Sequence, residues 1–85
     1  MMSLISKNHL DLRKQILLEL YQSDKELSYD ELVGKLEIKI RKRLTDSMTI
    51  LRKRMFIDQT ENKVKISNTG IIFIKNFLKK HPLDS

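Results

Sequence analysis

The sequence contains no cysteine and no tryptophan, and only one proline and two glycines interrupt its 85 residues. Without cysteine, neither a disulfide nor a thiolate nucleophile is available. The two histidines, His9 and His81, stand at opposite ends of the chain without a shared spacing, so we expect no structural zinc site. A Ser/His/Asp arrangement and a glycine-rich phosphate loop are also missing. We therefore predict no enzymatic activity and infer no cofactor or small-molecule ligand.

Long apolar runs are missing as well. The longest uninterrupted one is Ile71-Ile72-Phe73-Ile74, far short of the about twenty residues that a membrane span needs. The first six residues lack the charged region and apolar core of a secretory signal, so we expect a cytoplasmic protein. The apolar content of 40% is enough to build a core, and we predict one small domain over residues 1–85.

Positive charge is concentrated in one segment. Lys and Arg number 17 against 11 Asp and Glu, which gives a net charge of +6. The segment 35–54 holds eight of the basic residues and only two acidic ones, Glu37 and Asp46. The eight are Lys35, Lys39, Arg41, Lys42, Arg43, Arg52, Lys53 and Arg54. The rest of the chain is neutral, so the excess charge indicates a binding site more than a generally basic protein.

Apolar residues at helical spacing predict four helices, over residues 9–22, 29–37, 41–55 and 68–80. We expect Asn8 to cap the first helix and Ser67 to cap the last. Ser28 and Glu31 have the spacing of a capping box, which would open the second helix. That helix is predicted to bury Leu32, Val33 and Leu36.

The helix predicted over 41–55 has the clearest pattern. Its apolar residues form an arc only about 80° wide, so one thin stripe contacts the core and the remainder faces outward. The stripe consists of Ile40, Leu44, Met48, Leu51 and Met55. We expect both methionines to be core residues. The opposite face carries Lys42, Thr45, Asp46, Thr49 and Lys53, with Arg41 and Arg52 on one shoulder and Arg43 and Arg54 on the other.

A two-stranded hairpin is predicted over 56–67, because Lys63-Val64-Lys65-Ile66 alternates polar and apolar residues. Leu27 fits either a hydrophobic contact before the cap of helix 29–37 or a short strand, and the sequence leaves the two open.

In the last helix, the apolar residues other than Ile72 span about 160°, which is wide for one helix on a small core. Such a face often marks a partner surface.

The predicted order is helix, helix, helix, strand, strand, helix, which is mainly α with a small β-hairpin. Three motifs stand in this order within the stretch 27–70: Leu27-Ser28-Tyr29-Asp30-Glu31-Leu32-Val33, Leu44-x3-Met48-x2-Leu51-x3-Met55-Phe56-Ile57, and Ile66-Ser67-Asn68-Thr69-Gly70. Through them the stretch resembles the winged-helix (winged helix-turn-helix) DNA-binding domain of small prokaryotic transcription regulators. In this family a glycine usually stands where this chain has Met55. A methionine does not easily adopt the left-handed conformation, so we expect the join between helix and hairpin to differ here.

The resemblance implies a transcriptional regulator that binds double-stranded DNA. Helix 41–55 would enter the major groove, and the hairpin would lie along the backbone or the minor groove. We assign Lys42, Thr45 and Thr49 to base edges, and Arg41, Arg43, Arg52 and Lys53 to phosphates. Lys63 and Lys65 would contact DNA from the hairpin, and Ser28 and Tyr29 could add a phosphate bond at a helix N-terminus.

The broad apolar face of helix 68–80 suggests a homodimer, with Ile72, Phe73 and Phe77 at or near the interface. The alternative is that both phenylalanines fill the core of the single chain and only Ile72 is exposed.

Two other functions remain open from the sequence. One is a winged-helix protein-interaction module without nucleic-acid binding, in which the basic helix docks an acidic partner. The other is association with RNA or the ribosome.

Overall fold

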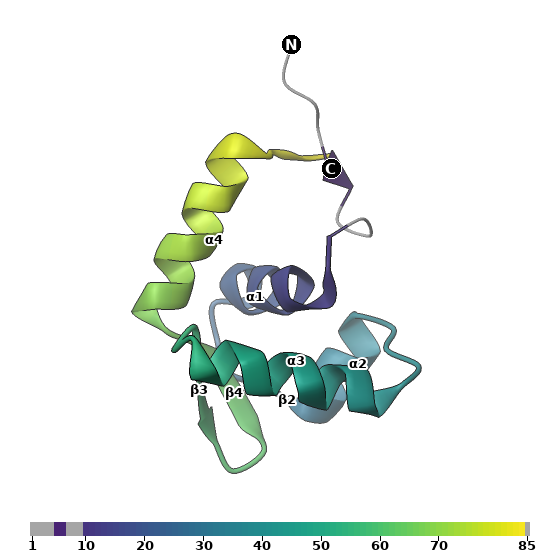
Figure 1. Cartoon of the computed structure of the whole chain (residues 1–85). Helices are drawn as coiled ribbons and strands as arrows, with labels where there is room; N and C mark the ends of the chain where they lie inside the picture. The colour runs from purple at the N-terminus through teal and green to yellow at the C-terminus, as the bar shows by residue number, and fades with distance from the viewer. Residues whose placement is uncertain (1–4, 7–9, 85) are drawn as a thin grey trace.

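The computed structural model describes residues 5–6 and 10–84, and it is mainly helical with a small antiparallel sheet (Figure 1). Its elements in order are β1 (Ile5–Ser6), α1 (Leu12–Ser23), β2 (Leu27–Ser28), α2 (Tyr29–Lys35), α3 (Arg41–Lys53), β3 (Ile57–Thr60), β4 (Lys63–Ile66), α4 (Asn68–Lys80) and β5 (Leu83–Asp84). β1 and β5 pair in parallel near the ends of the chain. The four predicted helices and the hairpin are therefore confirmed.

α1 begins three residues later than predicted because Asp11 caps it. The Asp11 carboxylate accepts a hydrogen bond from the Lys14 amide at 2.9 Å. The cap predicted at Asn8 lies outside the described residues. At the other end, Asp24 adopts a left-handed conformation with φ 53° and closes the helix with a bond to the Leu20 carbonyl. An aspartate tolerates this conformation better than most residues.

The capping box of α2 is confirmed. The Ser28 hydroxyl accepts from the Glu31 amide at 3.1 Å, and the Glu31 carboxylate accepts from the Ser28 amide at 3.2 Å. α2 ends at Lys35, two residues earlier than predicted. Of the three side chains expected in the core, only Leu32 is fully buried, while Val33 and Leu36 are half-buried.

Leu27 forms a strand, which settles the alternative that the sequence left open. β2 pairs with β4 through Leu27 and Val64, so the sheet has three strands in the order β2-β4-β3. In the hairpin itself, Ile57 lies opposite Ile66 and Gln59 opposite Val64. The sheet thereby fastens the connection between α1 and α2 to the hairpin.

α1 is the central element of the core, and α4 and α3 pack against it on different sides, with α4 crossing it steeply (Figure 1). The described core consists of Leu10, Ile16, Leu17, Leu18, Leu20, Leu27, Leu32, Leu44, Met48, Leu51, Ile57, Val64, Ile66 and Ile74. No polar or charged residue is buried in the described part of the chain. None of the helices there is long and apolar enough to cross a lipid bilayer.

The buried stripe of α3 is shorter than predicted. Leu44, Met48 and Leu51 are buried, as expected, but Ile40 is 57% exposed and Met55 is 71% exposed. The prediction that Ile40 and Met55 join the stripe is therefore wrong. Both residues lie where the chain leaves helical geometry: Ile40 is the extended N-cap of α3, and Met55 follows its last turn.

Met55 also adopts the left-handed conformation that the sequence argued against, with φ 61°. Its amide bonds to the Arg52 carbonyl and the Phe56 amide bonds to the Leu51 carbonyl, both at 3.0 Å. This pair of bonds is the Schellman ending that usually has glycine at the left-handed position. Phe56 then stacks on Phe73 of α4, with ring centroids 4.7 Å apart. The expectation of a different join is thus wrong, because these surrounding bonds and the stacked ring hold Met55 in place.

Candidate nucleic-acid interface

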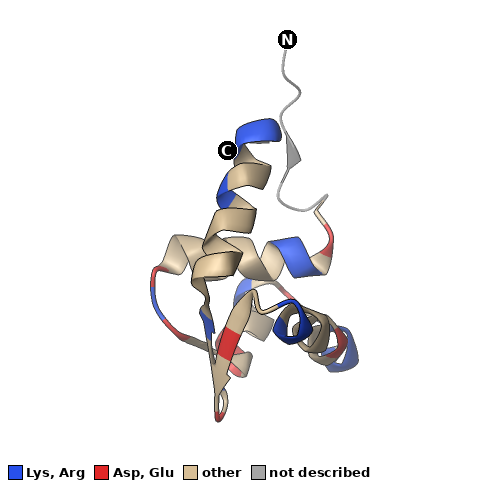
Figure 2. Ribbon diagram, turned by 60° about the vertical axis from the view of Figure 1, so that its left-hand side comes forward, with Lys and Arg blue, Asp and Glu red and all other residues tan. Residues whose placement is uncertain are grey.

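α3 exposes a polar face lined with cations, because only its narrow stripe is buried. Lys42, Arg43, Arg52 and Lys53 are all exposed, and Thr45 is exposed between them. Figure 2 shows Lys and Arg at both ends of this helix. The structure therefore brings together on one surface the residues predicted to contact base edges and phosphates.

Arg41 has a partner inside the chain. Its Nη2 lies 3.1 Å from Oδ1 of Asp30 on α2. Both side chains are largely exposed, and an exposed pair of this kind stabilises the fold by at most about 1 kcal/mol. Arg41 is thus held near α2 by a weak ion pair that a phosphate could replace.

Thr45 and Thr49 donate their hydroxyl hydrogens to the helix itself. Thr45 Oγ1 bonds to the Arg41 carbonyl at 3.3 Å, and Thr49 Oγ1 bonds to the Thr45 carbonyl at 3.0 Å. The oxygens keep their capacity to accept, and Arg52 Nη2 already lies 3.5 Å from Thr49 Oγ1. These threonines therefore offer acceptors and methyl groups to a ligand, not donors.

Asp46 and Ile50 complete this face. Asp46 is exposed, and within the described residues it makes no ion pair with Lys42 or Arg43, which stand four and three residues before it in the helix. Ile50 is 36% exposed, and the sequence analysis assigned it no role. Its place outside the apolar arc of α3 was the signal that could have identified it. An exposed isoleucine between charged side chains is suited to an apolar contact.

The two lysines of the hairpin differ in their surroundings. Both Lys63 and Lys65 are exposed on β4. Lys65 lies directly opposite Asp58 on β3, whereas Lys63 lies opposite Thr60. A carboxylate on the facing strand offsets part of the charge of Lys65. Lys63 in turn lies close enough to Glu31 for its charge to help lower the pKa of that carboxyl, so each lysine of the hairpin has an acidic neighbour.

Ser28 and Tyr29 are engaged in fastening α2 to the hairpin. Besides the capping box of Ser28, the Tyr29 amide donates to the Asn62 carbonyl at 3.3 Å, and the Tyr29 hydroxyl donates to Gln59 Oε1 at 3.2 Å. Two carboxylates, Asp30 and Glu31, occupy the first turn of the helix. This helix N-terminus thus already has acidic partners for its positive end.

The residues assigned to a dimer interface lie on α4, which projects from the rest of the chain (Figure 1). Ile72 is 62% exposed. Phe73 and Phe77 are half-buried and line an open recess of about 300 Å³ with Asn76, Lys80 and His81. The centroids of the His81 and Phe77 rings lie 4.9 Å apart, and Lys14 Nζ lies 5.4 Å from the centroid of Phe77. The phenylalanines are thus half covered by their own chain.

Comparison of the chain with protein-family models, with curated proteins and with solved structures finds no match. Within residues 5–6 and 10–84, no group of three or more His, Asp or Glu side chains could hold a metal ion. The functional argument therefore depends on the geometry and charge of the surfaces described above.

Proposed function

We propose that the chain is a winged-helix domain that binds double-stranded DNA and regulates transcription. The observation that carries this proposal is the outer face of α3, where exposed cations surround small threonines. The major groove is about 12 Å wide, admits one helix and is walled by phosphates. A helix with cations on its flanks and short side chains at its centre fits this groove, because its centre can approach the base edges closely.

Each group on this face has a role in the proposal. Lys42, Thr45 and Thr49 face the base edges, while Arg41, Arg43, Arg52 and Lys53 bind phosphates. Ile50 adds an apolar contact of the kind that a thymine methyl group accepts. The β3–β4 hairpin follows the backbone or the minor groove and contacts it through Lys63 and Lys65. Ser28 and Tyr29 contribute by holding the hairpin against α2.

We propose further that the DNA-binding form is a homodimer paired through α4. This is supported by the exposed Ile72 and by the recess at Phe73 and Phe77 on a projecting helix. A second copy is the suitable occupant, because one apolar surface pairs with itself about a two-fold axis. Two α3 helices would then contact half-sites about one turn of DNA apart. Measuring the molecular mass of the protein in solution tests the proposed homodimer. A monomeric mass at micromolar protein concentration would overturn it.

DNA binding is tested by fluorescence anisotropy with a random duplex at several salt concentrations. We expect log K to fall against log salt with a slope of about −0.9 for each phosphate neutralised. A double variant, Arg52→Gln with Lys53→Gln, should flatten this slope by about 1.8. The matched control is Lys25→Gln with Lys35→Gln, which removes the same charge from exposed positions that neither the proposed DNA contacts nor the proposed dimer interface use.

The outcomes separate the alternatives. DNA binding is supported if only the α3 variant weakens binding and single-stranded RNA competes poorly. Equal losses in both double variants would mean nonspecific attraction to a basic chain. Efficient competition by RNA would favour the RNA alternative. A flat salt slope together with capture of an acidic protein would favour the interaction module.

A further inference from the structure

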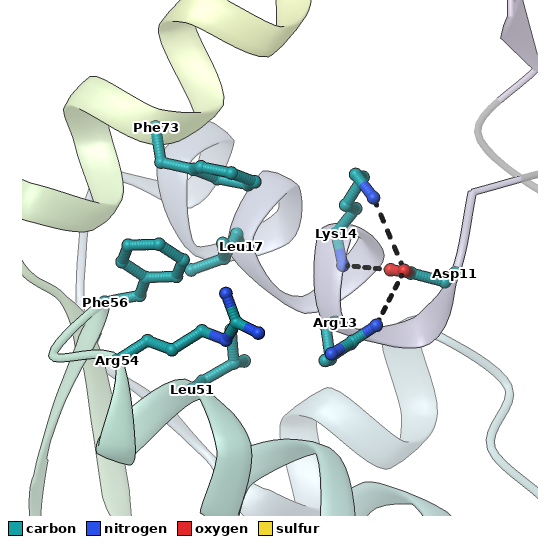
Figure 3. Close-up of a pocket in the computed structure, with 8 residues that line it drawn as sticks. All are labelled: Asp11, Arg13, Lys14, Leu17, Leu51, Arg54, Phe56 and Phe73. Carbon is teal, nitrogen blue, oxygen red and sulfur yellow. Dashed lines mark hydrogen bonds and ion pairs between the residues drawn. The ribbon is translucent and has the colours of Figure 1, made fainter.

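A small cavity lies where the start of α1, the end of α3 and the first half of α4 meet (Figure 3). Its apolar walls are Leu17, Leu51, Phe56 and Phe73, and its volume is about 130 Å³. An apolar protein cavity of about 150 Å³ is known to accept benzene. The volume of this pocket is therefore close to that needed by one six-membered ring, although it is not a closed apolar cavity but opens toward the charged side chains at its mouth.

The mouth of the cavity is cationic. Arg13, Lys14 and Arg54 line it together with a single carboxylate, that of Asp11. Arg13 Nη2 and Lys14 Nζ each lie 3.4 Å from Asp11 Oδ2. The Arg54 side chain has no hydrogen bond or ion pair within the described residues, and Figure 3 shows its guanidinium extending toward Leu17 and Arg13. One arginine at this mouth is thus left without an anion.

Asp11 cannot serve as that anion, because it is already committed to α1. Its carboxylate accepts the capping bond from the Lys14 amide at 2.9 Å. Burial raises the pKa of Asp11, but the bond from Lys14 and the charges of Lys14 and Arg13 outweigh it and hold the pKa below its usual range. Asp11 is therefore ionised at neutral pH and remains bound to its two neighbours, while Arg54 stays unpaired.

We propose that this cavity binds a small aromatic monocarboxylate, with its ring against the side chains of Leu17, Leu51 and the stacked pair Phe56 and Phe73, and its carboxylate on Arg54. A guanidinium holds a carboxylate through two parallel hydrogen bonds, and the remaining donors of Arg13 lie across the same mouth. Inorganic phosphate would leave the apolar walls unused, and a neutral ring would leave Arg54 unpaired. The pocket therefore favours a ligand that has both an aromatic ring, for the apolar walls, and a carboxylate, for the unpaired Arg54.

This pocket bears on α3, because Leu51 belongs to that helix and Arg54 and Phe56 follow its last residue. Arg54 is also the one arginine near α3 that the proposed DNA contacts do not use. A bound carboxylate would cancel its charge close to the DNA-binding face and so weaken the attraction of phosphates. The coupling, unlike the pocket itself, rests on the proposed DNA binding.

Binding is tested by titrating the ¹⁵N-labelled full chain with benzoate and following its backbone amide signals, without DNA. We expect saturable shifts at millimolar benzoate that centre on Leu17, Leu51, Phe56 and Phe73. Benzyl alcohol, which has the ring without the charge, and acetate, which has the charge without the ring, should each produce much smaller shifts. Absence of saturation, equal effects of acetate, or shifts spread over all basic surfaces would overturn the pocket.

A pair of arginine variants sharpens this test. Arg54→Gln should weaken benzoate binding by about tenfold or more, whereas Arg43→Gln, which removes the same charge from α3 away from this cavity, should leave it unchanged. Equal losses in both variants would overturn the role of Arg54. Both arginines are exposed, so both variants should fold, and their amide spectra verify it.

The coupling is measured separately, as DNA affinity with and without saturating benzoate at constant ionic strength. We expect benzoate to weaken DNA binding by the wild type and to leave the affinity of Arg54→Gln unchanged. An unchanged wild-type affinity would overturn the coupling. The benzoate titration contains no DNA. A chain that fails to bind DNA can therefore still bind benzoate, so each of the two proposals can be overturned without the other.

Discussion

The hydroxyl of Ser67 donates a hydrogen bond to the main-chain carbonyl of Met55, with 2.6 Å between the two oxygens. The Ser67 amide donates to the Phe56 carbonyl at 3.0 Å, and the Ser67 hydroxyl accepts from the Gly70 amide at 3.1 Å. One serine thus caps α4 and fastens its start to the end of α3, across the whole hairpin. The bonds to the carbonyls of Met55 and Phe56 hold the two ends of the hairpin together.

Met55→Gly should stabilise the chain by about 1 kcal/mol. Met55 has a left-handed backbone that costs a residue with a Cβ about 1–2 kcal/mol, and its side chain is 71% exposed, so little burial is lost. Urea denaturation measures the change. Met55→Ala is the control, because alanine keeps the Cβ and should not stabilise. An equal gain in both variants would contradict the explanation by backbone strain.

Gly70→Ala should destabilise the chain by about 1–3 kcal/mol, as overpacking does. A Cβ at Gly70 would collide with the Phe56 carbonyl oxygen and lie 2.8 Å from Cγ1 of Ile66. A carbonyl in the main chain cannot rotate away as a flexible side chain can. Thermal unfolding measures the loss, and wild-type stability in this variant would contradict the close contact of α4 with the hairpin.

Gly34→Ala should have the opposite effect and stabilise the chain by about 1 kcal/mol. Gly34 is an exposed residue inside α2, and apart from its chain neighbours and the backbone of its own helix no atom lies within 4 Å of the position that its Cβ would take. Alanine therefore gains helix propensity at no steric cost. The same thermal unfolding experiment serves both glycines, and a loss of stability at position 34 would show that α2 needs the glycine.

The four helices could be predicted because their determinants are local. Ser28 and Glu31 form their capping box within one turn, and the spacing of Leu44, Met48 and Leu51 fixes which side of α3 is buried. The left-handed conformation of Met55 could not be predicted, because a bond that helps to hold it comes from Ser67, twelve residues further along the chain. A conformation that is locally unfavourable can be imposed by such tertiary contacts.

The candidate nucleic-acid interface could also be predicted only where it depends on the local sequence. The outer face of α3 follows from angular position alone, so its exposed cations could be predicted. The partners of Arg41 and Tyr29 could not, since Asp30 and Gln59 reach them from other elements. The cavity beside Arg54 is also invisible in the sequence, because α1, α3 and α4 meet there only after folding.

Glu31→Gln should reduce stability at neutral pH but not in acid. The bond from the Ser28 amide is the main cause that lowers the pKa of Glu31 below its ordinary value of 4.5. A carboxyl whose pKa is lower in the folded state stabilises the fold above its unfolded pKa, and this contribution disappears as the pH falls through the folded pKa. The difference in unfolding free energy between wild type and Glu31→Gln should therefore be constant near neutral pH and shrink below about pH 4.5.

The pKa itself is measured by following the side-chain carboxyl carbon of Glu31 in an NMR titration. Ser28→Ala is the companion variant: it removes the hydroxyl that completes the capping box and retains Glu31. We expect the pKa of Glu31 to rise toward its ordinary value in this variant, because the bond from the Ser28 side chain is lost and the N-terminal turn of α2 is less firmly held. A wild-type pKa at or above 4.5, or a stability difference independent of pH, would mean that the charged capping box does not stabilise α2 in solution.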